Sequence, residues 1–144
     1  FNGVGYLVTY DVTASDGTTV KSFRKILVNT QSSKNTNPTL SDITSNGGSL
    51  TGLPGSQIPI APSFGSGSEQ TYFFQDGDGN ISQLVETLTT TWFTSDGEVD
   101  FYRTEGLAEN FFTPPNPEPA GHDTVIVAIT RDGRGGVDTL QKNL

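Results

Sequence analysis

Cysteine is absent from the 144-residue chain, and so is methionine. Without cysteine the protein can form no disulfide and no thiolate metal site, and it has no thiol nucleophile. Cysteine usage therefore permits an oxidising compartment without demonstrating one. Because the sequence begins at Phe1 with no initiator methionine, we expect a processed product or a piece of a longer protein.

Basic residues are few, since eight Lys and Arg stand against sixteen Asp and Glu and give a formal net charge of -8. Nucleic-acid binding needs clustered basic side chains, and here they are scattered from Lys21 to Lys142. We therefore expect no nucleic-acid partner. No apolar run approaches the roughly 20 residues that cross a bilayer, and the first residues lack the features of a signal peptide. We expect no membrane insertion.

Apolar and polar residues alternate with a period of two along the chain, and helical periodicity does not persist. The first predicted strand carries four apolar residues on one face: Tyr6, Val8, Tyr10 and Val12. A turn around Asp16-Gly17 follows, and Val20 to Val28 returns as the second strand. The pattern predicts an all-β fold that begins with a hairpin.

The end of the chain repeats this hairpin pattern. Residues 124–130 alternate, a glycine-rich turn follows, and residues 137–144 form the closing strand. Aligning Asp16-Gly17 on Asp132-Gly133 with a one-residue gap places Val20, in the second strand of the first hairpin, on Val137. The sequence therefore contains a partial internal repeat.

The partial repeat suggests a division of the chain. We interpret residues 1–30 as the C-terminal hairpin of a preceding domain, and residues 39–144 as the next domain, which ends in its own equivalent hairpin. Residues 31–38 are polar and carry no large apolar side chain, which is typical of a linker.

Short strands separated by turn residues fill the second domain and predict a β-sandwich of about 100 residues. Before the closing pair, the expected strands are 39–44, 57–64, 69–75, 83–94, 98–104 and 110–113. Trp92 lies in the longest of them, on one face with Leu88 and Thr90. We expect it to be a core residue.

Several stretches of this domain resemble a known family. They are Leu88-Thr-Thr-Thr-Trp92-Phe93-Thr-Ser-Asp-Gly97, Phe111-Phe112-Thr-Pro114-Pro115, Thr124-Val-Ile-Val and Arg131-Asp-Gly-Arg-Gly-Gly-Val137. They look like the immunoglobulin-like domains repeated in bacterial surface proteins and predicted lipoproteins. The first hairpin is similar to the closing strands of a polycystic-kidney-disease-type module.

This resemblance implies an immunoglobulin-like β-sandwich preceded by a β-hairpin from a partial repeat. It also implies a spacer, adhesion or display role at an extracellular or cell-surface location, and it carries over no catalytic residue and no cofactor. The expected partners are neighbouring domains or copies of the same protein, with a glycan or a host or prey surface as the alternative.

Candidate catalytic residues are sparse. His122 is the only histidine, and no Gly-x-Ser-x-Gly elbow accompanies it. One histidine cannot form a zinc site, which needs three or four His, Cys or carboxylate ligands. Glu98 and Asp100 share a strand face, whereas glycoside hydrolysis needs two acids opposed across a cleft. We therefore expect a protein that is not an enzyme.

One stretch begins like a calcium loop, because Asp76, Asp78 and Asn80 occupy its first three ligand positions. The sixth position should be glycine and is Ile81, and the twelfth should be glutamate and is Thr87. The same residues are what a tight hairpin turn requires. The sequence favours the turn and leaves calcium as a weak alternative.

Arg131 to Gly136 allow two interpretations. Glycine-rich backbone flanked by two arginines could cradle an anion. The favoured interpretation is a long hairpin turn in which the glycines adopt positive φ and Asp132 caps backbone N–H groups.

Aromatic residues come largely in adjacent pairs, and strand neighbours point to opposite faces, so each pair places one ring outside the core. The candidate interaction surface comprises Tyr72, Phe74, Tyr102 and Phe111. Such rings pack against another domain or chain, or serve as sugar platforms in a carbohydrate-binding module. A further alternative is a fibre subunit that donates the hairpin of Tyr6, Val8, Tyr10 and Val12 by strand addition.

Overall fold

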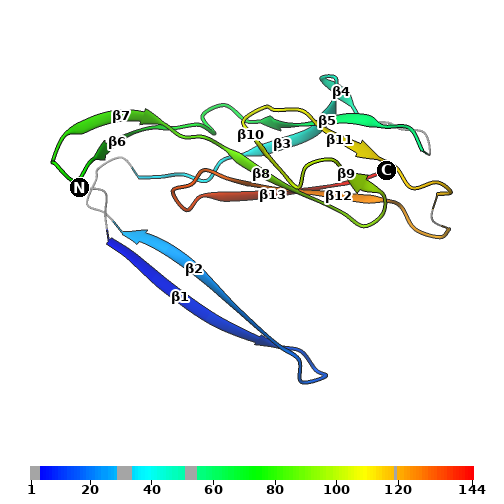
Figure 1. The fold of residues 1–144 in the computed structure, drawn as a ribbon, viewed down its shortest axis with the longest axis horizontal. Coiled ribbons are helices and arrows are strands. Elements are labelled where there is room, and N and C mark those ends of the chain that lie inside the picture. Colours follow the sequence, from blue (N-terminus) through cyan, green and yellow to red (C-terminus); the bar gives the residue numbers. More distant parts are fainter. Residues whose placement is uncertain (1–3, 29–33, 51–54, 119) are drawn as a thin grey trace.

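A computed structural model describes residues 4–28, 34–50, 55–118 and 120–144 (Figure 1). The described residues form β-strands, and they include no helix that is long and apolar enough to cross a membrane. All strand pairs are antiparallel. The prediction of an all-β fold is confirmed.

Two sheets form the body of the molecule, and two separate ribbons accompany them. One sheet has the order β10-β8-β12-β13 and consists of β8 (Thr89–Thr94), β10 (Arg103–Glu105), β12 (Val125–Arg131) and β13 (Val137–Asn143). The other has the order β4-β3-β5-β11-β9 and consists of β3 (Leu40–Ser45), β4 (Gly48–Ser49), β5 (Ile58–Phe64), β9 (Glu98–Val99) and β11 (Asn110–Thr113). The ribbons are β1 (Val4–Thr13) with β2 (Thr19–Val28), and β6 (Thr71–Gln75) with β7 (Ile81–Val85).

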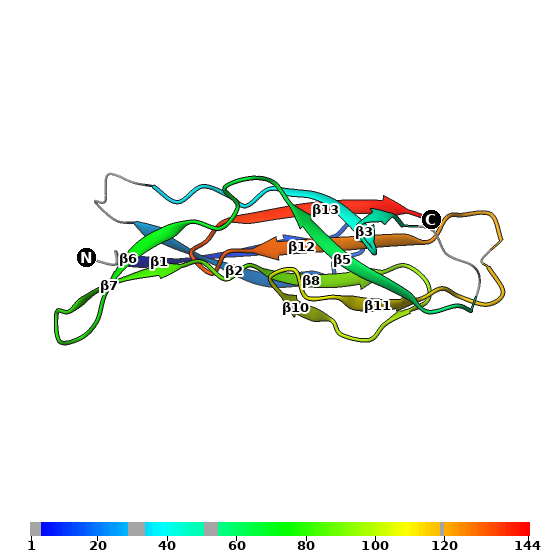
Figure 2. The ribbon, with the colours of Figure 1, turned by 90° about the horizontal axis from the view of Figure 1, so that it is seen from above.

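The two sheets pack face to face around one hydrophobic core, as the layers in Figures 1 and 2 show. Alternate residues of β5 and β12 point inward, which is the pattern that a sheet with one buried face requires. The core cluster draws on both sheets and contains Leu40, Ile43, Leu50, Ile58, Ile60, Trp92, Phe112, Ile126 and Ala128. The fold is therefore β-sandwich-like.

Trp92 lies in β8 and is only 2% exposed, so its predicted place in the core is confirmed. Leu88 and Thr90, expected on the same face, are fully buried. The indole Nε1 donates a hydrogen bond to Thr104 Oγ1 at 2.9 Å, which ties β8 to the edge strand β10. The largest side chain of the core thus has its one polar atom satisfied.

Two predicted strands are each divided in the structure. The expected strand 83–94 becomes β7 and β8, because the chain leaves the β6–β7 ribbon at Glu86 and enters the sandwich at Leu88. The expected strand 98–104 becomes β9, which pairs with β11, and β10, which pairs with β8. The chain crosses from one sheet to the other there, and alternation alone contains no signal for such a crossing.

The described part of the predicted linker, residues 34–38, lies against the sandwich; the rest of that segment is outside the described residues. Asn35 Nδ2 donates to Asp132 Oδ2 at 2.7 Å, and Thr36 N donates to Gln70 Oε1 at 3.2 Å. Pro38 is buried. These residues therefore contact the turn of the closing hairpin and the residue that precedes the β6–β7 ribbon.

Candidate interaction surface

The N-terminal ribbon is a regular hairpin. Its strands β1 and β2 pair from Val4 with Val28 to Thr13 with Thr19. The loop closes with a hydrogen bond from Ala14 N to Thr18 O at 2.9 Å, and Gly17 supplies the positive φ of 85° that this turn requires. In Figure 1 the hairpin lies below the rest of the chain and diverges from the four-stranded sheet towards its turn.

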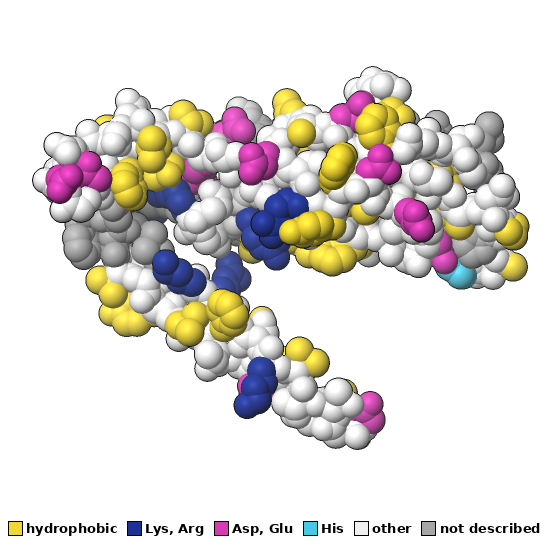
Figure 3. All heavy atoms as spheres, viewed as in Figure 1, with side chains coloured by type: hydrophobic (Ala, Val, Ile, Leu, Met, Phe, Trp, Pro, Cys, Tyr) yellow, Lys and Arg dark blue, Asp and Glu magenta, His cyan; other side chains and the backbone are white. Residues whose placement is uncertain are grey.

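One side of this hairpin carries eight apolar residues, which we call the hairpin apolar face: Val4, Tyr6, Val8, Tyr10, Val12, Val20, Ile26 and Val28. Each of these side chains is between 44% and 62% exposed. Tyr6, Val8, Tyr10 and Val12 do share one side, as alternation predicted, and register places Ile26 opposite Tyr6 and Val20 opposite Val12. Apolar and basic side chains of the hairpin are both visible at the surface in Figure 3.

The opposite side of the hairpin is also exposed, which the sequence analysis did not single out. Leu7 is 64% exposed and Phe23 is 70% exposed. Their positions alternate with those of the hairpin apolar face, so strand periodicity contains the signal for both. The ribbon thus presents apolar side chains on its two sides.

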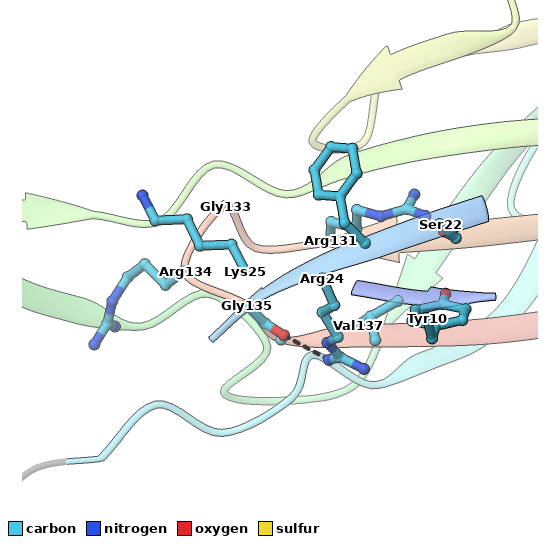
Figure 4. A pocket seen from close by; sticks show the side chains of 11 residues that line it. Tyr10, Ser22, Arg24, Lys25, Arg131, Gly133, Arg134, Gly135 and Val137 are labelled. Atoms are coloured by element: carbon cyan, nitrogen blue, oxygen red, sulfur yellow. Dashed lines mark hydrogen bonds between the residues drawn. The ribbon is translucent and has the colours of Figure 1, made fainter. Parts of the chain in front are cut away.

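The hairpin meets the sandwich at the turn between β12 and β13. Arg24 Nη2 donates to the carbonyl oxygen of Gly135 at 3.0 Å, and a pocket of about 560 Å³ lies beside this contact (Figure 4). Arg24, Lys25, Arg131 and Arg134 line the pocket. Their charged groups point in different directions in Figure 4, so they do not converge on one anion.

The turn between β12 and β13 is organised by its own aspartate. Asp132 is 3% exposed, and its Oδ1 accepts hydrogen bonds from Arg134 N at 2.7 Å and Gly136 N at 2.9 Å. A Cβ on Gly136 would collide with the same carboxylate. Two N–H groups of the turn are therefore bonded to Asp132, which is its predicted capping role.

The four aromatic residues expected at an interaction surface lie on different sheets. Tyr72 of β6 is half-buried under the Arg134 guanidinium, 4.5 Å from its ring centroid, while Phe74 on the same strand is 40% exposed. Tyr102 precedes β10 and is 68% exposed, with Arg103 at 5.6 Å from its ring. Phe111 of β11 is half-buried. The structure does not bring these four rings together on one strand face.

The β6–β7 ribbon exposes more apolar surface than the sequence analysis assigned to it. Register places Val85 opposite Thr71 and Ile81 opposite Gln75, on the side of Phe73. Phe73, Ile81 and Val85 are 60%, 69% and 61% exposed. Phe73, the neighbour of the predicted Phe74, is the more exposed ring of the pair.

His122 comes close to a serine and an aspartate, but in an order that does not suit nucleophilic catalysis. Its Nε2 lies 3.1 Å from Asp96 Oδ2, and Ser95 Oγ donates to the same oxygen at 2.7 Å. The hydrogen bond from Ser95, followed by that from His122, holds the pKa of Asp96 below its ordinary value. The carboxylate lies between serine and histidine, whereas a triad needs histidine in the middle.

The other predicted acids are also placed. Asp100 accepts hydrogen bonds from Gln57 Nε2 at 3.2 and 3.3 Å, and Glu98 is exposed in β9. Among the described residues, no three His, Cys, Asp or Glu side chains are grouped so that they could hold a metal ion.

Asp76, Asp78 and Asn80 do come together, in the turn of the β6–β7 ribbon. Asp76 Oδ1 accepts hydrogen bonds from Asp78 N at 3.0 Å and Asn80 N at 2.9 Å, and Asp76 Oδ2 accepts one from Asn80 Nδ2 at 3.0 Å. These bonds, that of the Asn80 side chain first, lower the pKa of Asp76. The carboxylate is thus engaged by the turn itself.

We predict that calcium leaves the melting temperature of the protein unchanged, because the Asp76 carboxylate already serves the turn and a ligand raises stability only by binding the native state. Thermal unfolding with added calcium chloride and with a chelator measures this. An upward shift with calcium that Asp78→Asn abolishes would instead make Asp76, Asp78 and Asn80 ligands.

Comparisons with known proteins give no relative for this chain, since no family model, curated protein or solved structure matches it.

Proposed function

We propose that this chain is a non-catalytic structural or adhesive module of a bacterial extracellular protein, joined to neighbouring modules or copies through its N-terminal hairpin. The hairpin apolar face carries the proposal. Eight apolar side chains along one side of a two-stranded ribbon are 44–62% exposed in the single chain.

A two-stranded ribbon on its own is marginally stable in water, and its exposed apolar side chains favour association. Burial contributes about 25 cal/mol per Å² of apolar surface, so covering this face would stabilise both the ribbon and the complex. A partner surface is the simplest role for such a ribbon, because the described sandwich covers it only around the Arg24–Gly135 contact.

The extracellular assignment and the non-catalytic assignment rest on other support. The motifs around Trp92 and Asp132 resemble immunoglobulin-like domains of bacterial surface proteins, and the β-sandwich-like architecture is compatible with that resemblance. The arrangement of Ser95, Asp96 and His122 lacks the order of a catalytic triad. Both observations favour a spacer or adhesion module over an enzyme.

The test is a matched pair of substitutions on neighbouring residues of β1. We expect the intact chain to form concentration-dependent oligomers, and Val8→Asp to abolish them by placing a charge in the hairpin apolar face. Thr9→Asp puts the same charge on the opposite side and should leave association unchanged. Light scattering over a concentration series measures both.

A chain that stays monomeric at all concentrations, or equal behaviour of the two variants, would contradict the proposal. Binding of the intact chain to an immobilised glycan, retained by Val8→Asp, would favour the carbohydrate-binding alternative, in which the exposed Tyr102 and Phe74 serve as platforms.

A further inference from the structure

The N-terminal hairpin and the closing hairpin β12–β13 have connections of the same length. Each connection has five residues, Ala14–Thr18 in one and Asp132–Gly136 in the other, between the last strand pairs Thr13–Thr19 and Arg131–Val137. In both, the first loop N–H donates to the carbonyl of the fifth residue, at 2.9 and 3.3 Å.

The fourth residue of both loops is a glycine with positive φ, Gly17 at 85° and Gly135 at 110°. The two hairpins therefore correspond without a gap, and each residue of the first matches the residue 118 positions later, as Ala14 matches Asp132. The one-residue gap of the sequence alignment is unnecessary, because it paired the two Asp-Gly dipeptides, which occupy different positions in their loops.

This correspondence identifies the buried side of the closing hairpin with the hairpin apolar face. The residues of β12 that match Val8, Tyr10 and Val12 are Ile126, Ala128 and Thr130, and all three are fully buried against the core. The side of β1 that is exposed in this chain is thus the side that β12 turns inward.

The second strands agree at two of the positions that face the core. Arg24 matches Lys142, whose Nζ contacts Asp42 Oδ1 at 2.8 Å and Ile43 O at 2.9 Å across the edge of the sandwich. Ile26 matches Leu144, which packs against the core cluster. A cation and an apolar residue therefore occur at equivalent positions of β2 and of the end of the chain.

The contacts of β12 show what the N-terminal hairpin lacks. β12 pairs with β8 along six residue pairs, from Ile126–Thr94 to Arg131–Thr89, and it covers a core built by both sheets. β1 pairs only with β2. Within residues 4–28, 34–50, 55–118 and 120–144, no strand pairs with its other edge as β8 pairs with β12.

We infer that β1–β2 is the closing hairpin of a preceding sandwich of the same design, in a tandem chain with a repeat of 118 residues. The partner that covers the hairpin apolar face is the unpaired β8-type strand and the open core of that unit. This inference rests on the proposed function and names the partner of its hairpin.

Charge supports the same partner. Residues 1–28 contain three basic residues, Lys21, Arg24 and Lys25, and two acidic ones, Asp11 and Asp16, so their net charge is +1. Because the whole chain has a net charge of -8, residues 29–144 have a net charge of -9. A sandwich with the composition of this one is therefore acidic, and its net charge is opposite in sign to that of the hairpin.

The test restores the inferred partner. Residues 39–123, a sandwich without its closing hairpin, are placed directly before residues 6–144, so that β1 follows Asp123 as β12 does. Tyr10→Ala is included because Tyr10 takes the place of the fully buried Ala128. We expect the amide protons of β1 to exchange at least about 100-fold more slowly than in the intact chain, since they become part of a cooperative unit.

Two variants and an internal control accompany this measurement. Val8→Asp in the extended chain should remove the added protection, whereas Thr9→Asp should retain it, because only Val8 faces the restored core. The downstream sandwich, with its own β12–β13, reports whether the extended protein is intact. Amide exchange of β1 as fast as in the intact chain, with the downstream sandwich folded, would overturn the inference.

A second measurement does not depend on engineering. The gene that encodes this chain should continue upstream and encode a β8-type strand with a tryptophan 118 residues before Trp92. An upstream sequence without such a strand would also overturn the inference. In either case, loss of self-association in Val8→Asp would leave the proposed function standing, so that the two failures are distinguishable.

Discussion

Replacing Trp92 by alanine is expected to lower the free energy of unfolding by about 3–5 kcal/mol, the range for removing a large buried aromatic side chain. Trp92 is 2% exposed and belongs to the core cluster that joins the two sheets. The substitution also leaves Thr104 Oγ1, a buried acceptor, without its indole donor at 2.9 Å. Loss of that hydrogen bond adds to the cost of the cavity.

Phe93→Ala provides the matched control for this change. Phe93 is the next residue of β8, points to the opposite side and is 52% exposed, so its truncation should cost less than about 1 kcal/mol. Urea unfolding followed by circular dichroism measures both variants without relying on tryptophan emission. Equal effects of Trp92→Ala and Phe93→Ala would contradict the placement of Trp92 between the sheets.

Most strands of the sandwich could be predicted because one side of each is buried. The expected strand 110–113 coincides with β11, and the closing pair differs from β12 and β13 by one residue at its ends. In β12 the buried and half-buried residues alternate over its first six positions, which is the period-two signal itself. Local turn residues such as Asn46 and Gly47, both with positive φ, supplied the boundaries.

The divisions of the long strands could not be predicted, because they depend on partners far away in the sequence. Glu86 continues the alternation of its neighbours, yet it lies between β7 and β8, where its side chain meets the backbone of Gln70 and the guanidinium of Arg134. A glutamate in an alternating stretch predicts an exposed position. This glutamate is buried because the distant Arg134 compensates its charge.

The placement of the candidate interaction residues could be predicted only in part, for the same reason. The side shared by Tyr6, Val8 and Tyr10 follows from alternation within one strand, and the structure contains it. The distribution of Tyr72, Phe74, Tyr102 and Phe111 depends on which sheet each strand joins. Alternation within a strand contains no information about that choice.

The contact between Glu86 and Arg134 joins the base of the β6–β7 ribbon to the turn between β12 and β13. Arg134 Nη1 lies 2.7 Å from Glu86 Oε1, and the two side chains are 14% and 0% exposed. Glu86 Oε2 accepts a second hydrogen bond from Gln70 N at 2.9 Å, while the guanidinium also covers the Tyr72 ring. Both charges are thus desolvated and held by several partners.

Arg134→Ala should therefore lower the free energy of unfolding by about 3–5 kcal/mol, because it leaves a fully buried carboxylate without its cation. Glu86→Ala should cost less, since the freed guanidinium of Arg134 is nearer to water. Arg103→Ala is the control. Arg103 is exposed and lies 5.6 Å from the ring of the exposed Tyr102, so its loss should cost less than about 1 kcal/mol. The double variant Glu86→Leu with Arg134→Met should recover part of the loss, since a buried pair replaced by apolar side chains is often neutral. Urea unfolding of the four variants measures this order of stabilities. Equal stabilities of the Arg134→Ala and Arg103→Ala proteins would contradict the burial of the Arg134–Glu86 ion pair.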